Sequence, residues 1–187
     1  YIINNGIVTA NSHACSYAIL ALQTAYLKAH YPLEYMCAVM NIYYRDKDQF
    51  LDYLKEVRRL GIGILPPDIN RSQVYFSTLD NNIIYGLAPI KGMGTDSSQL
   101  LIDSRPFTSL EQIAELPKRT TNKKVLKALC FSGALDSISQ LDRGQMYTQL
   151  LELREDKEEP PEFNDKIKYE LEEEYLNILI SGHPLKG

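Results

Sequence analysis

The residues best suited to binding a ligand are two glycines near the middle of the chain, in the sequence IKGMG at residues 90–94. Glycine lets the backbone turn tightly and approach a ligand closely, because it has no side chain. The segment that follows, TDSSQLLIDSR, is predicted to be a helix, and the first amides of a helix have no partners within it. Such amides, together with the positive end of the helix dipole, favour an anion. The spacing therefore predicts a phosphate-binding turn.

The order apolar, Gly, apolar, Gly and then helix is the pattern of a helix-hairpin-helix motif, which contacts the nucleic-acid backbone and carries no base-sequence information. The residues predicted to contribute are those of the hairpin, the first helical residue and a nearby cation: Lys91, Gly92, Met93, Gly94, Thr95 and Arg105. Thr95 or Asp96 is expected to cap the helix with its side chain. The alternative is a tight turn that only joins two structural elements, since Gly-x-Gly is common.

A second candidate hairpin follows about 45 residues later, in CFSGALDSI at residues 130–138. The helix before it, NKKVLKAL, begins with Lys123 and Lys124, and the turn itself contains Ser132 and Gly133. This signal is weaker than the first, because it has a single glycine and its apolar residues are predicted to belong to the core. Two hairpins together nevertheless favour a tandem arrangement.

No group of side chains is predicted to bind a metal or a cofactor. The cysteines Cys15, Cys37 and Cys130 have no metal-ligand spacing with the histidines, and we expect them to be buried free thiols in a reducing cytoplasm. The acidic run at residues 170–174 is predicted to be a solvated helix face. His183 is expected to be structural. For His13 the alternative to a functional role is that of a partly buried residue beside Ser12, which is expected to cap the helix.

Charge is distributed unevenly along the 187 residues, whose net charge is −4. From Glu152 to Glu174 there are eleven acidic and four basic residues, which leaves the remainder of the chain at +3. Any DNA contact is therefore expected from residues before about 150. No stretch is long and apolar enough to cross a membrane and no signal peptide is recognisable, so a cytoplasmic location is expected.

The elements that must position these residues are mostly helices. Residues 1–11 are predicted to be two short strands around Asn4-Asn5-Gly6, and residues 14–30 a buried helix, because they are apolar nearly all round. A β-hairpin is expected to turn at residues 80–82, after an extended segment around LPPDIN. The other predicted helices are a second one from Pro32, a third over 46–60 with Gly61 after its end, and further ones over 95–104, 109–116, 122–131, from about 143, and over 165–180.

Several long motifs resemble the α subunit of bacterial DNA polymerase III, the C-family replicative polymerase. The replicative or the error-prone form of the DnaE-type subunit fits better than the PolC type. The sequence SHACSYAILALQTAYLKAHYPLEYMCAVM resembles the fingers of that family. LKEVRRLGIGILPPDINRSQVYFS, IIYGLAPIKGMG, PFTSLEQI, NKKVLKALCFSGALDS and ILISGHPL are similar to its later landmarks, in the same order. The resemblance covers about residues 12–185.

This resemblance implies a mainly α fold, with a helical fingers segment at 12–64 and a tandem helix-hairpin-helix domain with one small β-hairpin at 65–150. Residues 151–187 would form an acidic linker and a helix leading to the next domain. Ser12, His13 and Tyr17 would line the incoming-nucleotide pocket, and the hairpin at 91–94 would contact duplex DNA. The expected partners are primer–template DNA, the incoming dNTP, the rest of the subunit and the replisome subunits of the holoenzyme.

The same resemblance places the palm carboxylates, and the Mg²⁺ that they hold, outside this chain. The fragment is therefore expected to bind no cofactor and not to polymerise alone. The alternatives are a stand-alone DNA-binding module without sequence specificity, and a purely structural helical domain.

Residues 1–11 depart from the family, which has Phe-Asn-Lys before its Ser-His. YIINNGIVTAN resembles the C-terminal tail of an intein, which ends in Asn and is followed by a nucleophile. Asn11 would cyclise to cut the chain, and Ser12 would carry the upstream segment as an ester. Ala10 stands where His is usual, which puts the assisting group in doubt. The alternative is a divergent polymerase segment.

Overall fold

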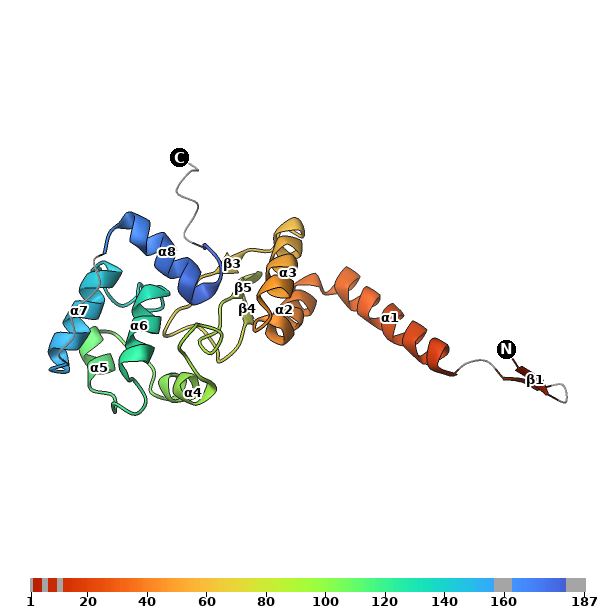
Figure 1. The fold of residues 1–187 in the computed structure, drawn as a ribbon, viewed down its shortest axis with the longest axis horizontal. Helices are drawn as coiled ribbons and strands as arrows, with labels where there is room; N and C mark the ends of the chain where they lie inside the picture. The colour runs from red at the N-terminus through yellow and green to blue at the C-terminus, as the bar shows by residue number, and fades with distance from the viewer. Residues whose placement is uncertain (1, 5–6, 10–11, 157–162, 181–187) are drawn as a thin grey trace.

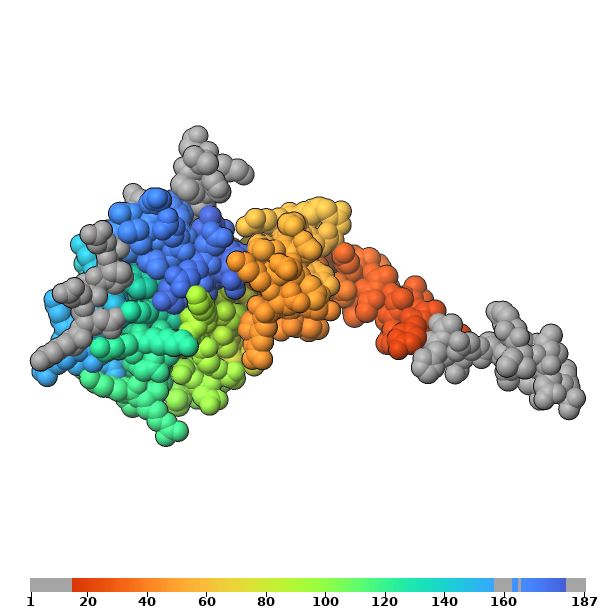
Figure 2. Space-filling view, viewed as in Figure 1, coloured from red at the N-terminus to blue at the C-terminus, as the bar shows by residue number. Residues whose placement is uncertain are grey.

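The computed structural model describes residues 2–4, 7–9, 12–156 and 163–180, with side chains from Cys15 onward except that of Asp165. Over these residues the chain forms eight α-helices and five short strands, which confirms the mainly helical class. One helix, α1, extends away from a compact body made by all the later elements (Figure 1). The same arm stands clear of the body in the space-filling view (Figure 2).

The N-terminal strands and α1 follow the predicted order. Strand β1 (Ile2–Asn4) pairs antiparallel with β2 (Ile7–Thr9), while the predicted turn residues Asn5 and Gly6 lie outside the described residues. Helix α1 (Ser12–His30) then covers the whole predicted range of 14–30 and begins two residues earlier.

The expectation that α1 is buried is wrong for this chain. Tyr17 is 65% exposed and Leu22 is 72% exposed, and Cys15, predicted to be a buried thiol, is exposed as well. An apolar pattern predicts that a helix packs against other residues, but no element in the described part of the chain buries the apolar surface of this one. Only the C-terminal end of α1 is tied to the body, through an ion pair of 2.7 Å between Lys28 and Glu56.

Helices α2 (Pro32–Tyr43) and α3 (Lys47–Arg59) begin and end as predicted. Pro32 occupies the first turn of α2, where a missing N–H costs nothing. The side chain of Asp46 caps α3 by accepting from the backbone N–H of Gln49. Gly61 ends α3 with φ of +73°, and the Ile62 N–H donates back to the Val57 carbonyl, which makes a Schellman ending.

A small mixed sheet follows, in the order β3-β5-β4. The predicted hairpin consists of β4 (Ser77–Leu79) and β5 (Asn82–Ile84), and its turn residues Asp80 and Asn81 both have positive φ, as a two-residue turn requires. The sequence predicted only extended chain where β3 (Ile64–Leu65) pairs parallel with β5. A pairing of two residues leaves too short a pattern to predict.

The remaining helices match the predicted positions closely. They are α4 (Thr95–Asp103), α5 (Leu110–Ala114), α6 (Lys123–Phe131), α7 (Arg143–Leu153) and α8 (Asp165–Leu176). Helix α8 ends earlier than the predicted residue 180, because Asn177 adopts a left-handed conformation with φ of +58°.

One hydrophobic core runs from Met36 in α2 to Ile178 beyond α8. Aromatic rings join its parts, since Phe76 lies 5.8 Å from Phe50 of α3 and 4.6 Å from Tyr85, measured between ring centroids. Cys37 and Cys130 are buried in this core, as expected. The core includes residues on both sides of residues 64/65, where the domain boundary stays a prediction.

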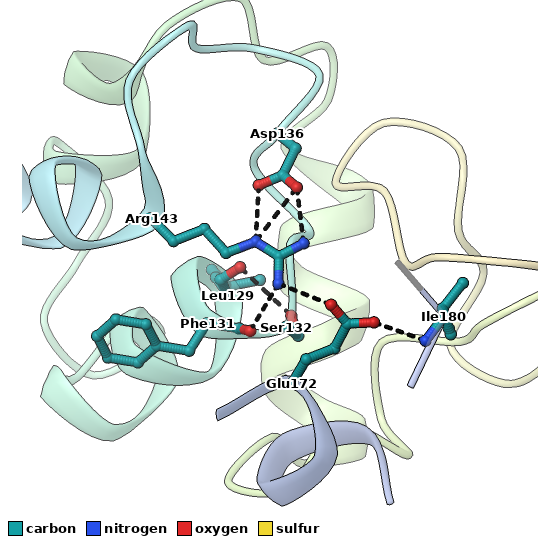
Figure 3. Close-up of polar contacts among 7 residues, drawn as sticks. All are labelled: Leu129, Phe131, Ser132, Asp136, Arg143, Glu172 and Ile180. Carbon is teal, nitrogen blue, oxygen red and sulfur yellow. Dashed lines mark hydrogen bonds and ion pairs between the residues drawn. The ribbon is translucent and has the colours of Figure 1, made fainter. Parts of the chain in front are cut away.

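A buried arginine fastens α8 to the rest of the body (Figure 3). Arg143, at the start of α7, is 5% exposed, and its guanidinium lies 3.3 Å from the carboxylate of Glu172, which is 1% exposed. The guanidinium also donates to Asp136 at 2.8 Å and to the Phe131 carbonyl at 3.2 Å. The other oxygen of Glu172 accepts from the backbone N–H of Ile180 at 2.6 Å. The acidic run was predicted to be solvated throughout, and Glu172 is the exception.

Replacing Arg143 by methionine should lower the free energy of unfolding by about 3–5 kcal/mol, because Glu172 then stays buried without a countercharge. Urea denaturation measures the change. Arg58→Met, at an exposed position of α3, is the control and should change stability by less than about 0.5 kcal/mol. Adding Glu172→Met to the Arg143→Met variant should recover much of the loss. A loss that stays undiminished in the double variant would contradict this account.

The three cysteines should differ sharply in reactivity toward an aromatic disulfide reagent near pH 8. Cys15 is exposed, whereas burial and the nearby Glu34 raise the pKa of Cys37 to about 11, and burial raises that of Cys130 well above its usual range. We expect one rapidly reacting thiol in the native protein and three after denaturation. A Cys15→Ser variant should have no rapid phase. The absence of a rapid phase in the wild type would show that α1 is covered in solution.

Candidate nucleic-acid interface

The first hairpin has the geometry that its sequence predicts. Gly92 has φ of +96°, a conformation that side chains disfavour, and the Met93 N–H donates to the Ile90 carbonyl at 2.9 Å to close the turn. A Cβ atom on Gly92 would also lie 3.3 Å from the side chain of Lys124. Gly92 is therefore a glycine because the turn itself requires one.

Gly94 is a glycine for a different reason. It is the N-cap of α4, with extended φ and ψ of −130° and 164°, and a Cβ placed on it would meet nothing within 4 Å. Neither the backbone conformation nor internal packing excludes a side chain at this position. Because Gly94 has no side chain, the space on the outside of the hairpin, in front of the first amides of α4, is open.

The first turn of α4 receives no side-chain cap. The prediction that Thr95 or Asp96 caps it is wrong, because the cap position is one residue earlier, at Gly94, which has no side chain to offer. Four other helices are capped by a side chain: α3 by Asp46, α6 by Asn122, α7 by Asp142 and α8 by Asn164. Helix α2, which begins with Pro32, has no side-chain cap either. The N-terminus of α4 thus offers its amides to an external acceptor.

Two of the predicted lysines, Lys91 and Lys124, lie at this hairpin. The aliphatic part of Lys124, at the start of α6, packs over Gly92, and its side chain is exposed. Lys123 precedes it and is partly exposed. Lys91 is exposed, and its ammonium lies 2.8 Å from the carboxylate of Glu174 in α8. This acidic neighbour could not be predicted from the sequence, because it is 83 residues away along the chain.

The second hairpin is closed by the protein itself. Gly133 has φ of +84°, but a Cβ on it would lie 2.3 Å from the guanidinium of Arg143. Ser132 is fully buried and donates to the Leu129 carbonyl, and the N–H of Gly133 donates to the Cys130 carbonyl at 3.1 Å. The two predicted hairpins therefore differ in what occupies their outer side.

Arg105 is partly buried and binds the loop that follows β3. Its guanidinium donates to the carbonyls of Ile69 at 2.6 Å and Ser72 at 2.5 Å. Burial lowers the pKa of this guanidinium, and nearby Asp68 opposes that effect. The contacts of Arg105 are those of a residue that holds two segments of the fold together.

The residues predicted for the nucleotide pocket, Ser12, His13 and Tyr17, lie at the far end of α1. Tyr17 is exposed there, and Ser12 and His13 form the first turn of the helix, with side chains outside the described part of the structure. Asn11 lies outside the described residues. Across residues 15–156 and 163–180, no cluster of histidine, cysteine and acidic side chains has the size of a metal site. None of the described helices is both long and apolar enough to cross a membrane.

Comparison with known proteins agrees with this geometry. A family model described as a helix-hairpin-helix motif matches residues 61–146, which include both hairpins. DNA polymerase III subunit alpha of Thermus aquaticus is 35% identical over 202 residues, which cover 93% of this chain and 16% of that protein. The proteins of the same name from Aquifex aeolicus and Mycobacterium tuberculosis are 35% and 32% identical, over 93% and 94% of this chain.

The chain spans 16–18% of the length of these relatives, so it corresponds to one part of a much longer protein. That part contains the helix-hairpin-helix motif. The chain is therefore homologous to a segment of DNA polymerase III subunit alpha, the segment that includes its helix-hairpin-helix region.

Proposed function

We propose that this chain is the part of a bacterial replicative DNA polymerase that holds primer–template DNA by its phosphate backbone. The observation that supports this most directly is Gly94, where an uncapped helix N-terminus faces open space in a chain that matches the helix-hairpin-helix family. A phosphate oxygen at this point accepts from the amides of α4, and Lys124 adds positive charge beside it. Contacts of this kind are independent of base sequence, as a replicative enzyme requires.

The first hairpin, and not the second, is the proposed contact. At the second hairpin Arg143 occupies the space in front of Gly133, and the backbone N–H of Gly133 donates to a carbonyl of the same turn. We propose that Ser132, Gly133 and Arg105 act structurally, by holding the domain in shape. Lys91, Gly92, Met93, Gly94, Thr95, Lys123 and Lys124 remain as the DNA-contacting set.

The role proposed for α1 is to form one wall of the incoming-nucleotide pocket. Its first turn contains Ser12 and His13, with Tyr17 one turn further on, in the sequence that resembles the fingers of the family. We propose that the exposed apolar surface of α1 packs against the rest of the polymerase subunit, which would supply the palm carboxylates and their Mg²⁺. The fragment alone would then bind DNA without nucleotidyl transfer, and replisome subunits would contact the complete protein in the cytoplasm.

Residues 1–11 are proposed to be the C-terminal tail of an intein. The paired strands β1 and β2 followed by Asn11 and Ser12 support this, since Asn cyclisation and a hydroxyl nucleophile are the groups that the chemistry requires. The relatives match 93–94% of the chain, which leaves room for a segment of this length outside the match.

Intact-mass analysis after expression of the whole coding sequence tests the splicing proposal. We expect a mature product that lacks residues 1–11 and has Ser12 joined directly to upstream polymerase sequence. An Asn11→Ala variant should retain residues 1–11, because alanine cannot cyclise to release them. A wild-type product that keeps these residues would show that they are a divergent polymerase segment.

Gly94→Glu tests the DNA-binding proposal. The variant should fold normally, because φ at this position is negative and a Cβ meets nothing within 4 Å. The new carboxylate would stand where the phosphate is proposed to bind, so affinity for primer–template DNA should fall by about tenfold or more, and the salt dependence by roughly one phosphate contact. Fluorescence anisotropy of a labelled duplex at low salt measures both.

Ala38→Glu supplies the matched control, since it adds the same charge at an exposed position of α2. It should weaken binding much less than Gly94→Glu. Equal effects of the two variants would mean that overall charge, and not the hairpin, determines affinity, and would favour a purely structural domain.

A further inference from the structure

The last turn of α8 lies directly against the proposed DNA-contacting hairpin. The backbone N–H of Lys91 donates to the Tyr175 carbonyl at 2.9 Å, and the hydroxyl of buried Tyr85 donates to the Leu176 carbonyl at 2.8 Å. The ammonium of Lys91 lies 2.8 Å from the carboxylate of Glu174. These three contacts join an acidic helix to the segment on which DNA binding is proposed to depend.

Glu174 is held in this position by the backbone and not by its own ion pair. Leu176 is buried in the core, and Glu172, one half-turn before Glu174, is fixed by Arg143. Both hydrogen bonds to the last turn of α8 come from groups other than the Lys91 ammonium. The backbone that carries Glu174 therefore stays beside Lys91 whether or not the two side chains are paired, so its carboxylate remains within reach of Lys91.

The ion pair itself is exchangeable. The side chains of Lys91 and Glu174 are 61% and 50% exposed, and exposed pairs of this kind contribute little to folding stability. Carboxylate and phosphate oxygens accept the same hydrogen bonds from an ammonium group. A DNA phosphate that reaches the hairpin thus meets a lysine that already has an anionic partner.

We propose that Glu174 competes with DNA phosphate for Lys91 and so sets the affinity of the hairpin below the value that its amides and lysines would otherwise give. This inference rests on the proposed function. When Lys91 turns to a phosphate, Glu174 loses its countercharge and remains close to the incoming anion. Weak backbone contacts that lack sequence specificity allow a protein to move along DNA, so a moderated affinity suits an enzyme that must advance after each nucleotide.

The test compares Glu174→Gln with Glu173→Gln in the 187-residue chain, using a labelled primer–template duplex at low salt. Both variants remove one negative charge from an exposed position of α8, but only Glu174 is paired with Lys91. We expect Glu174→Gln to tighten binding by about two- to fivefold, the equivalent of one exposed ion pair. Glu173→Gln should change it by less than about 1.5-fold, the residual long-range effect of one screened charge.

A double-variant cycle with Lys91→Gln separates competition for Lys91 from direct repulsion of DNA. Lys91→Gln alone should weaken binding, and Glu174→Gln should give no gain in the Lys91→Gln background. A gain that persists there, or equal gains from the Glu173 and Glu174 variants, would overturn the inference. The midpoint of urea denaturation should stay nearly constant across these variants. A purely structural role for the pair would instead shift this midpoint.

The two proposals fail in different ways. If Lys91→Gln and Gly94→Glu weaken binding while Glu174→Gln leaves it unchanged, the hairpin binds DNA and the competition is disproved. If neither Lys91→Gln nor Gly94→Glu weakens binding, the hairpin is not the DNA site and both proposals are wrong.

Discussion

The position of α8 depends on one buried ion pair, between Arg143 and Glu172. A carboxylate that is 1% exposed carries a large desolvation cost, which is offset here by the guanidinium at 3.3 Å and by the N–H of Ile180. A cation at the start of α7 is unfavourable to that helix's dipole, so Arg143 is not explained by its own helix. It is explained by the three groups that it joins, the Phe131 carbonyl and the Asp136 carboxylate around the second hairpin and the Glu172 carboxylate of α8.

The same arginine makes the two hairpins unequal. Both contain a glycine with positive φ, Gly92 and Gly133, and their sequences alone predict similar turns. The guanidinium of Arg143 lies over Gly133 and the side chain of Lys124 over Gly92, whereas the space in front of Gly94, two residues further on in the first hairpin, is open. One hairpin has thus become part of the core and the other faces outward, and the interaction that closes the first also holds α8 against the second.

Local sequence signals predicted the elements well, because each depends on a few neighbouring residues. Asp46 and Asn122 cap their helices, Gly61 ends α3, and the turn at Asp80 and Asn81 follows from residues that tolerate positive φ.

Two errors are local, the cap predicted at Thr95 or Asp96 and the end of α8, but most concern contacts between distant segments. Glu172 looks like its acidic neighbours in sequence, and only the approach of Arg143 from 29 residues away makes it a buried residue. The neighbour of Lys91 in space, Glu174, was likewise invisible in the sequence. Hydrophobic periodicity predicted that α1 needs cover but not which chain segment provides it.

The exposed helix α1 and the compact body differ in how far their apolar residues are buried within the described chain. The body has one continuous core. The proposed DNA contact is formed entirely by residues of the body, without any residue of α1. Helix α1 is joined to that body mainly through Lys28 and Glu56, and hydrogen bonds from Arg59 and Lys28 lower the pKa of the Glu56 carboxyl to about 2. Because the folded-state pKa lies below the ordinary value of about 4.5, the pair's contribution to stability is present above that value and is lost only as the pH falls through about 2.

The attachment of α1 is therefore insensitive to pH near neutrality, yet it holds only one end of the helix. The apolar residues toward the other end, such as Leu22, are left without cover in the described chain. Burying apolar surface stabilises by about 25 cal/mol per Å², so a surface of this kind is a strong driving force for association with whatever lies beside it. We infer that the position of the first turn of α1, where Ser12 and His13 lie, is determined by that association more than by the body described here.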